Sequence, residues 1–166
     1  MNKSTTTKLE SLKSESNSYS KLGHYTKAEK SIMKALELNP ESKSLRHDLA
    51  KALYQQKNYN KALKLLLELS PIVKSRQILF KDIAMCYYKM NNLEKALEAI
   101  QTSLADNPDK VSSLYAQGLI YRELEDYDKS LSSFNKLLSF DSDNRDALYQ
   151  MGKIMHQQGN YRAALD

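Results

Sequence analysis

The stretch GHYTKAEKSIMKAL (residues 23–36) decides the fold, because four further versions of it follow along the chain. They read KNYNKALKLLLELS (57–70), NNLEKALEAIQTSL (91–104), EDYDKSLSSFNKLL (125–138) and GNYRAALD (159–166). One small residue holds the same place in each version: Ala28, Ala62, Ala96, Ser130 and Ala164. The step is always 34 residues, a period typical of stacked supersecondary units.

Large side chains flank this small residue at helical spacing. The residue three positions earlier is Tyr25, Tyr59, Leu93, Tyr127 or Tyr161, and the one four positions later is Ile32, Leu66, Ile100 or Phe134. Spacings of three and four place side chains on one stripe of a helix. Each version therefore predicts an amphipathic helix.

A second helix precedes each of these. Its small residues, where two helix backbones can approach closely, are Ser16, Ala50, Ala84, Gly118 and Gly152. The residues between the two helices are His24, Asn58, Asn92, Asp126 and Asn160, most of which are good N-caps. Pro40 and Pro108 predict the end of a second helix, and Pro71 predicts an earlier end near Ser70 with an irregular connection over residues 70–76.

Composition agrees with an all-α protein. The chain has 166 residues, 41% of them hydrophobic, with only three Pro and four Gly. No stretch approaches the roughly 20 apolar residues of a membrane span, and the N-terminus lacks the apolar run of a signal peptide. We therefore expect a cytoplasmic protein without a transmembrane segment. Its single cysteine, Cys86, excludes an internal disulfide and a cysteine-cluster metal site.

Charge is distributed unevenly along the chain. Residues 1–76 contain 15 Lys and Arg against 7 Asp and Glu, a net charge of +8, whereas residues 77–166 contain 10 against 13, a net charge of −3. The basic half could meet an acidic partner, and the acidic half argues against a continuous nucleic-acid track. We expect the lysines to be dispersed over both faces of the helices as a solvated surface.

These motifs resemble the tetratricopeptide repeat family over nearly the whole chain. The resemblance assigns a tail at residues 1–8 and units at 9–42, 43–76, 77–110 and 111–144, with a partial unit at 145–166. It implies a right-handed α-solenoid of stacked antiparallel helix pairs. The large residue near the start of each unit is Leu12, Arg46, Phe80, Leu114 or Leu148, of which Arg46 departs from the family pattern.

The resemblance also implies a peptide-binding groove, lined by first-helix residues that the core does not use. The expected groove residues are Lys13, Asn17, His47, Lys51, Tyr54, Ile78, Lys81, Met85, Tyr88, Tyr115, Leu119, Arg122, Tyr149 and Lys153. The apolar and aromatic ones, Met85, Tyr88, Tyr115 and Leu119, could either dock an extended peptide or helix, or pack against neighbouring helices.

Two specialised family sites do not fit the sequence. In the two-carboxylate clamp of chaperone-binding members, Lys13 and Asn17 match, but Asp48, Ile78 and Asp82 occupy the other places, and the two acids would repel a carboxylate. The asparagine ladder of members fused to sugar transferases is also missing. Its column reads Ser14, Asp48, Asp82, Ala116 and Gln150.

Signs of catalysis are weak. His24, His47 and His156 lie in three different units, away from a carboxylate pairing that would suggest a metal site or catalytic dyad. Cys86 is expected to be a small core residue, and no Gly-rich phosphate loop is present. We therefore expect no enzyme activity and no cofactor.

Three functions remain open. The chain is either a protein-interaction scaffold, or a regulatory region of a longer transferase, kinase or phosphatase, or a basic adaptor for nucleic acid or an anionic membrane through residues 1–76. We favour the scaffold, with a peptide or helix of a partner protein as its ligand. Because Asp166 falls two residues after Ala164, inside a repeat helix, we expect the chain to be the N-terminal part of a longer protein. Self-association through its open end is also expected.

Overall fold

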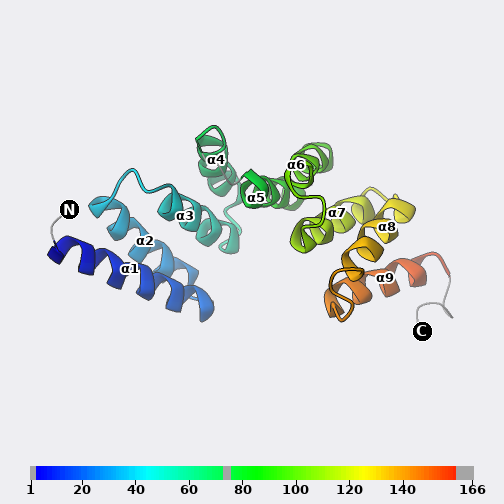
Figure 1. Cartoon of the computed structure of the whole chain (residues 1–166), viewed down its shortest axis with the longest axis horizontal. Helices are drawn as coiled ribbons and strands as arrows, with labels where there is room; N and C mark the ends of the chain where they lie inside the picture. Colours follow the sequence, from blue (N-terminus) through cyan, green and yellow to red (C-terminus); the bar gives the residue numbers. More distant parts are fainter. Residues whose placement is uncertain (1–2, 73–75, 160–166) are drawn as a thin grey trace. The chain divides into compact units, whose positions relative to one another are not determined.

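The computed structural model describes residues 3–72 and 76–159, and within these ranges every regular element is a helix. The first four helices are α1 (Lys3–Lys21), α2 (Tyr25–Leu38), α3 (Lys43–Gln55) and α4 (Tyr59–Leu69). They are followed by α5 (Arg76–Lys89), α6 (Leu93–Asp106), α7 (Val111–Glu123), α8 (Tyr127–Leu138) and α9 (Arg145–Gln157) (Figure 1). The all-α expectation is confirmed.

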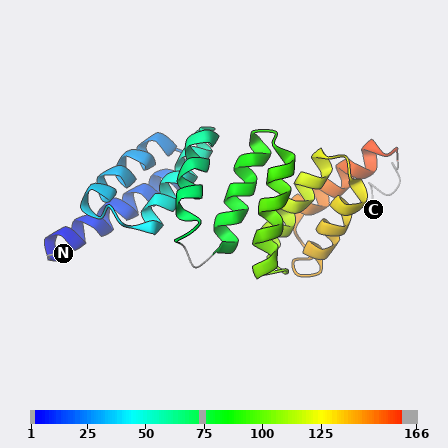
Figure 2. The ribbon, with the colours of Figure 1, turned by 90° about the horizontal axis from the view of Figure 1, so that it is seen from above.

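The chain forms two compact units, residues 1–74 and residues 75–166. In the first unit, α1 pairs with α2 and α3 with α4, and α2 also packs against α3. In the second unit, α5 pairs with α6 and α7 with α8, and α9 packs against both α7 and α8 (Figure 2). Each unit is thus a stack of helix hairpins, as the repeat predicts.

The 34-residue small position lies at the centre of each hairpin. Ala28, Ala62, Ala96 and Ser130 have no exposed surface, while Ala164 lies outside the described residues. The bulky residues four positions later, Ile32, Leu66, Ile100 and Phe134, are at most 2% exposed. Burial of these large apolar side chains against small ones is the main stabilising contribution that the sequence pattern predicts.

Three helices end where Pro40, Pro108 and Pro71 predict. The helices before Pro40 and Pro108 end at Leu38 and Asp106. α4 ends at Leu69 with Ser70 as its C-cap, so the predicted early end is confirmed. Of the irregular connection predicted for residues 70–76, residues 73–75 lie outside the described part.

At its start, the chain differs from the repeat pattern. α1 begins at Lys3, inside the segment expected to be a tail, and Thr7 Oγ1 donates to the Lys3 carbonyl within it. The odd Arg46 also has a structural role. Its Nε and Nη2 donate to the Pro40 carbonyl at 3.1 and 2.9 Å, so its guanidinium secures the connection between α2 and α3.

The turn inside each hairpin has a left-handed residue that the sequence pattern does not mark by type. Gly23, Lys57, Asn91 and Glu125 have φ between 58° and 75°, and Gly159 repeats the feature. The next amide reaches back five residues, for example from Asn58 to the Leu53 carbonyl at 2.9 Å. This is the bond of a Schellman motif, which closes a helix C-terminus.

The N-cap residues act unequally. Asn92 and Asp126 side chains accept from the amides of Lys95 and Lys129 at 3.3 and 3.2 Å. Asn58 and His24 form no side-chain cap bond, and Asn160 lies outside the described residues. The turn geometry is therefore common to the repeats, whereas the cap bond is not.

Candidate functional site

The second unit contains a cavity of about 340 Å³ on α5, α7 and α9, each of which is the first helix of its repeat. Its lining residues are Lys81, Met85, Val111, Ser112, Tyr115, Ala116, Asn144 and Asp146. Three of these, Lys81, Met85 and Tyr115, belong to the predicted groove. Met85 and Tyr115 are half-buried, so each gives one side to the core and one side to the cavity.

Tyr115 is held from both sides. Its ring packs against Phe134 with a centroid distance of 5.8 Å, and its hydroxyl accepts from Gln150 Nε2 at 3.4 Å. Gln150 Oε1 in turn accepts from Arg122 Nη1. Tyr115 is therefore fixed in place before any ligand arrives, which lowers the entropy cost of binding.

Arg122 links this contact to Tyr88. Its guanidinium forms an ion pair with Glu123, and Tyr88 Oη donates to Glu123 Oε1 at 3.2 Å. Tyr88, Glu123, Arg122, Gln150 and Tyr115 thus form a polar network across α5, α7 and α9, which we call the tyrosine network. Arg122 donates from Nη1 to Gln150 and from Nη2 to Glu123 within it, so the guanidinium is paired with Glu123 and helps to position the two tyrosines.

The pKa values follow from these contacts. The hydrogen bond from Arg122 lowers the pKa of Glu123, which stays ionised at neutral pH. Burial raises the pKa of Tyr88, and the neighbouring Glu123 carboxylate raises it further. Tyr88 is therefore a protonated donor at neutral pH.

One predicted groove residue, Leu119, is buried in the core of the second unit. Leu119 is only 8% exposed and belongs to the core cluster with Leu114, Phe134 and Ile154. Leu119 does not line the cavity, because it packs in the core with residues of α8 and α9. Ala116 is also buried, at 2% exposed, although it forms part of the cavity wall.

The other groove candidates of this unit are exposed. Ile78 is 47% exposed on α5, and Tyr149 is 65% exposed on α9. The Lys153 ammonium lies 5.7 Å from the centre of the Tyr149 ring, a cation–π distance. None of these three residues lines the cavity.

The repeat register could have identified two lining residues that the sequence prediction missed. Ser112 and Asp146 follow Ile78 by one and two repeat periods and therefore occupy its place in α7 and α9. The other two are Val111, the first residue of α7, and Asn144, the N-cap of α9. Asn144 also caps α9, since its Oδ1 accepts from the Ala147 amide at 3.0 Å.

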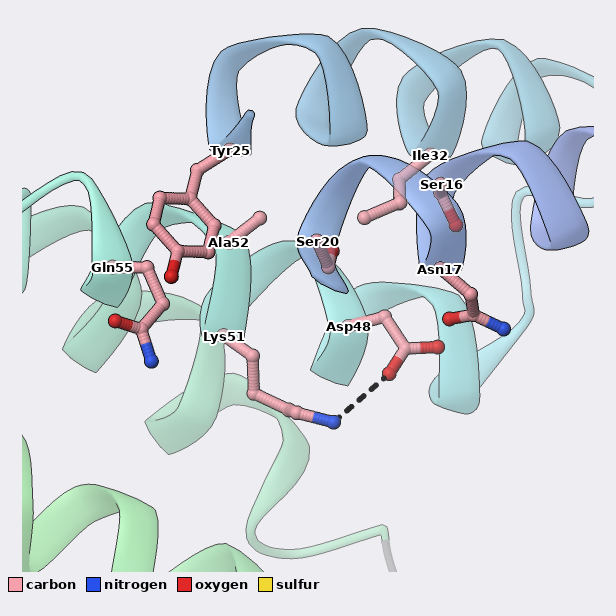
Figure 3. A pocket seen from close by; sticks show the side chains of 9 residues that line it. All are labelled: Ser16, Asn17, Ser20, Tyr25, Ile32, Asp48, Lys51, Ala52 and Gln55. Atoms are coloured by element: carbon pink, nitrogen blue, oxygen red, sulfur yellow. Dashed lines mark hydrogen bonds and ion pairs between the residues drawn. The ribbon is translucent and has the colours of Figure 1, made fainter. Parts of the chain in front are cut away.

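The first unit has a smaller and more polar cavity of about 210 Å³ between α1, α2 and α3 (Figure 3). Its lining residues are Ser16, Asn17, Ser20, Tyr25, Ile32, Asp48, Lys51, Ala52 and Gln55. Asn17 and Lys51 are predicted groove residues. Lys51 Nζ lies 3.4 Å from Asp48 Oδ1 at the cavity, so its charge is partly satisfied within α3.

Three other candidates of this unit do not line the cavity: Lys13, His47 and Tyr54. Tyr54 packs edge to face against Tyr59 at 5.3 Å between ring centroids. Its ring therefore supports the α3–α4 hairpin, in the way that tyrosine often covers a core edge.

Acidic residues at the clamp positions are paired with neighbouring lysines. Asp82 Oδ1 lies 2.8 Å from Lys81 Nζ, and Asp48 is paired with Lys51. The acids that interrupt the clamp pattern thus neutralise the nearest cations. A carboxylate ligand would find little free positive charge at either place.

The cysteine and the three histidines, which are the candidates for catalysis or metal binding, lie on different elements. Cys86 is fully buried, and burial, with a contribution from Asp82, raises its pKa to about 12. His24 lies at the N-cap of α2, His47 on α3 and His156 on α9. Within residues 3–72 and 76–159, no three His, Cys, Asp or Glu side chains are grouped to hold a metal ion. Over the same ranges, no helix is long and apolar enough to cross a membrane.

Comparisons with known proteins agree with the repeat. A family model described as TPR repeat matches residues 118–159, and two described as tetratricopeptide repeat match residues 20–82 and 82–110. No curated protein sequence gives a significant match.

Solved structures show the same fold. TTC0263, a thermophilic TPR protein of Thermus thermophilus, is 20% identical with a TM-score of 0.85, over 95% of this chain and 86% of its own. A tetratricopeptide repeat protein from Parabacteroides merdae is 25% identical with a TM-score of 0.72, over 95% and 63%. YrrB, described as a TPR protein with an unusual peptide-binding site, is 20% identical with a TM-score of 0.65, over 90% and 77%. The helix-hairpin stack and the three family matches together place this chain in the tetratricopeptide repeat family.

Proposed function

We propose that this chain is a non-catalytic, cytoplasmic interaction module. In this proposal it binds a peptide or helix of a partner protein in the cavity on α5, α7 and α9. The observation that carries the proposal is the cavity of about 340 Å³ lined by Met85 and Tyr115. Concave sites with mainly apolar walls and a few oriented polar groups are typical of binding sites. The fold itself supports an interaction role for the whole chain.

The cavity suits an apolar side chain flanked by polar backbone. Met85 offers an adaptable thioether, and Tyr115 offers a ring held by Phe134 and Gln150. The lining contains Lys81, which is paired with Asp82, and the single acid Asp146, so the site does not present a strong cluster of one charge. Asn144 adds an amide near the start of α9. The ligand in this proposal is a neutral peptide segment with one large apolar anchor.

A side chain that fills the cavity tests the proposal. Ser112 is exposed and lines the cavity, so Ser112→Arg blocks it without removing a core residue. Ser132 is exposed on α8 and lies outside the cavity, so Ser132→Arg is a matched control with the same change in charge. Peptides are first selected on the wild-type chain from a random display library, and their binding to both variants is then measured by fluorescence anisotropy.

The expected result is a loss of peptide binding by about tenfold or more in Ser112→Arg, with wild-type affinity in Ser132→Arg. Circular dichroism of both variants checks that the helices remain. The proposal of peptide binding in the cavity is contradicted if no peptide is selected, or if selected peptides bind Ser112→Arg as tightly as the wild type.

Self-association through α9 is the second proposed contact. Leu148 is 48% exposed there, whereas Leu114, one repeat earlier, is 2% exposed and packed in the core. An apolar residue at a position that is buried in the preceding repeat is a candidate contact surface. Light scattering measures the molar mass of the wild type and of Leu148→Glu. A contact through α9 predicts an oligomer for the wild type and a monomer for Leu148→Glu, and equal masses for the two proteins would contradict it.

A further inference from the structure

The outward faces of α2 and α4, opposite their buried residues, are rich in lysine. On α2 the exposed lysines are Lys27, Lys30 and Lys34, and on α4 they are Lys61 and Lys64. Met33 and Leu67 lie on the same faces, 52% and 44% exposed. We call these seven residues the lysine face. The expectation of lysines dispersed over both sides of the helices is wrong for α2 and α4, where all of them point outward.

These lysine charges are not neutralised within the first unit. Among the described residues, none of the five lysines is in an ion pair. The Lys27 ammonium lies 5.6 Å from the centre of the Tyr19 ring, which leaves its charge in place. These two helices contain three acids: Glu29, which accepts from Gln56 Nε2 at 2.7 Å, and Glu37 and Glu68 in the last turns. The lysine face is therefore a positively charged surface with two apolar side chains.

Repeat positions show that part of this surface is specific to the first unit. Lysine recurs in the second unit at the places of Lys27 and Lys61, but at the places of Lys30 and Lys64 the second unit has Glu98 and Ser132. The apolar pair, Met33 and Leu67, is replaced there by Gln101 and Asn135. The fold tolerates acidic, neutral and amide side chains at these positions, so neither Lys30 and Lys64 nor the apolar pair is needed to form the hairpin.

We propose that the lysine face binds the surface of an anionic lipid bilayer. Each lysine near an anionic membrane contributes favourable electrostatic energy, and the contributions of several add up to stable peripheral binding. Exposed Met and Leu side chains can enter the boundary between headgroups and acyl chains. The outward faces of α2 and α4 supply both parts of such a contact, with five lysines outside any ion pair and two exposed apolar side chains.

Other anionic partners fit this surface less well. An acidic helix needs a groove, and neither cavity is lined by a residue of the lysine face. Nucleic-acid readers commonly use arginine for base edges and aromatic rings for stacking, and the lysine face has neither. Lysine acts as a point charge without a fixed fork, which suits a fluid headgroup layer.

The test is sedimentation of the full chain with vesicles of phosphatidylcholine and phosphatidylserine, and with vesicles of phosphatidylcholine alone. Lys27→Glu/Lys61→Glu reverses two charges of the lysine face. Lys95→Glu/Lys129→Glu reverses two charges at the same repeat positions of the second unit and is the matched control. A third variant, Met33→Gln/Leu67→Asn, gives the apolar pair the side chains present in the second unit.

We expect binding to the phosphatidylserine vesicles that weakens with added salt. We also expect a loss of about tenfold or more in the partition coefficient for Lys27→Glu/Lys61→Glu and a smaller loss for the apolar variant, with the control close to wild type. The proposal is overturned by no sedimentation with phosphatidylserine at low salt, or by equal losses in the control. It is also overturned if the chain binds single-stranded RNA or polyglutamate but not vesicles. None of the residues changed in Lys27→Glu/Lys61→Glu or Met33→Gln/Leu67→Asn lines the cavity of the second unit, so we expect peptide binding there to be unchanged. A failure of the membrane proposal can therefore be told apart from a failure of the peptide-binding proposal.

Discussion

The ring of Phe134 occupies the space that a side chain at Gly118 would need. A Cβ on Gly118 would lie 2.5 Å from Phe134 Cε1 and 2.6 Å from Cζ. Ser130 Oγ donates to the Gly118 carbonyl at 2.7 Å in the same place, so the backbone of α7 lies close to α8 here. Phe134 is fully buried and has little room to move.

Gly118→Ala should therefore destabilise the chain by roughly 1–3 kcal/mol, because the overpacking outweighs the gain in helix propensity. Urea unfolding followed by circular dichroism measures this change. The matched test is Gly118→Ala/Phe134→Leu, in which the smaller side chain frees the space. If the free-energy losses of the two single variants simply add, the proposed contact is not the cause.

The left-handed turn residues predict opposite effects at equivalent positions. Glu125 has φ of 60°, which strains a side chain with a Cβ, so Glu125→Gly should stabilise the chain by up to about 1 kcal/mol. Gly23→Ala, at φ of 75°, should destabilise it by about 1 kcal/mol. Asn91→Gly is the control, since Asn tolerates this conformation and should change least. Thermal unfolding of the three variants gives their order, and a stabilising Gly23→Ala would contradict the argument.

Cys86 should be inert in the folded chain. Its side chain is fully buried and its pKa is raised to about 12. At pH 8 a thiol reagent should therefore react only after unfolding, at a rate that rises with denaturant. Labelling followed by mass spectrometry measures this, and rapid labelling in native buffer would refute the buried position.

The raised pKa of Cys86 also makes stability depend on pH. An unfolded thiol ionises from about pH 9, whereas the folded one stays protonated up to about pH 12. Stability therefore falls as pH rises through this window, because the unfolded state loses its proton first. Cys86→Ala removes this contribution, so its unfolding free energy should fall less between pH 8 and pH 10 than that of the wild type. Equal slopes for the two proteins would contradict the prediction.

The tyrosine network predicts a shift at Glu123. Arg122 lowers the pKa of Glu123, so the ion pair contributes stability at neutral pH that is lost as pH falls through this lowered pKa. Because the Glu123 side chain is 44% exposed, the contribution should be no more than about 1 kcal/mol. Carboxyl-carbon NMR titration should show a higher Glu123 pKa in Arg122→Gln than in the wild type. An unchanged pKa would mean that the ion pair does not form in solution.

The candidate site could be predicted only in part. The family resemblance predicted Lys81, Met85 and Tyr115 as groove residues, and these three line the cavity of the second unit. It placed Leu119 there as well, although that side chain is buried in the core. Register fixes the helix on which a residue lies, but a helix packed against neighbours on several sides buries residues that a single stripe would leave exposed.

The sequence by itself determined the helix hairpins, their length and their buried small positions, because a 34-residue period with helical spacing allows few other arrangements. Only the tertiary structure showed that Lys57 and Glu125 take a left-handed conformation and that Arg122 joins Tyr88 to Tyr115 through Glu123 and Gln150. The tyrosine network depends on contacts between residues up to 35 positions apart. Periodicity records which side chains share a helix face, whereas the packing of one helix on the next decides which of them meet.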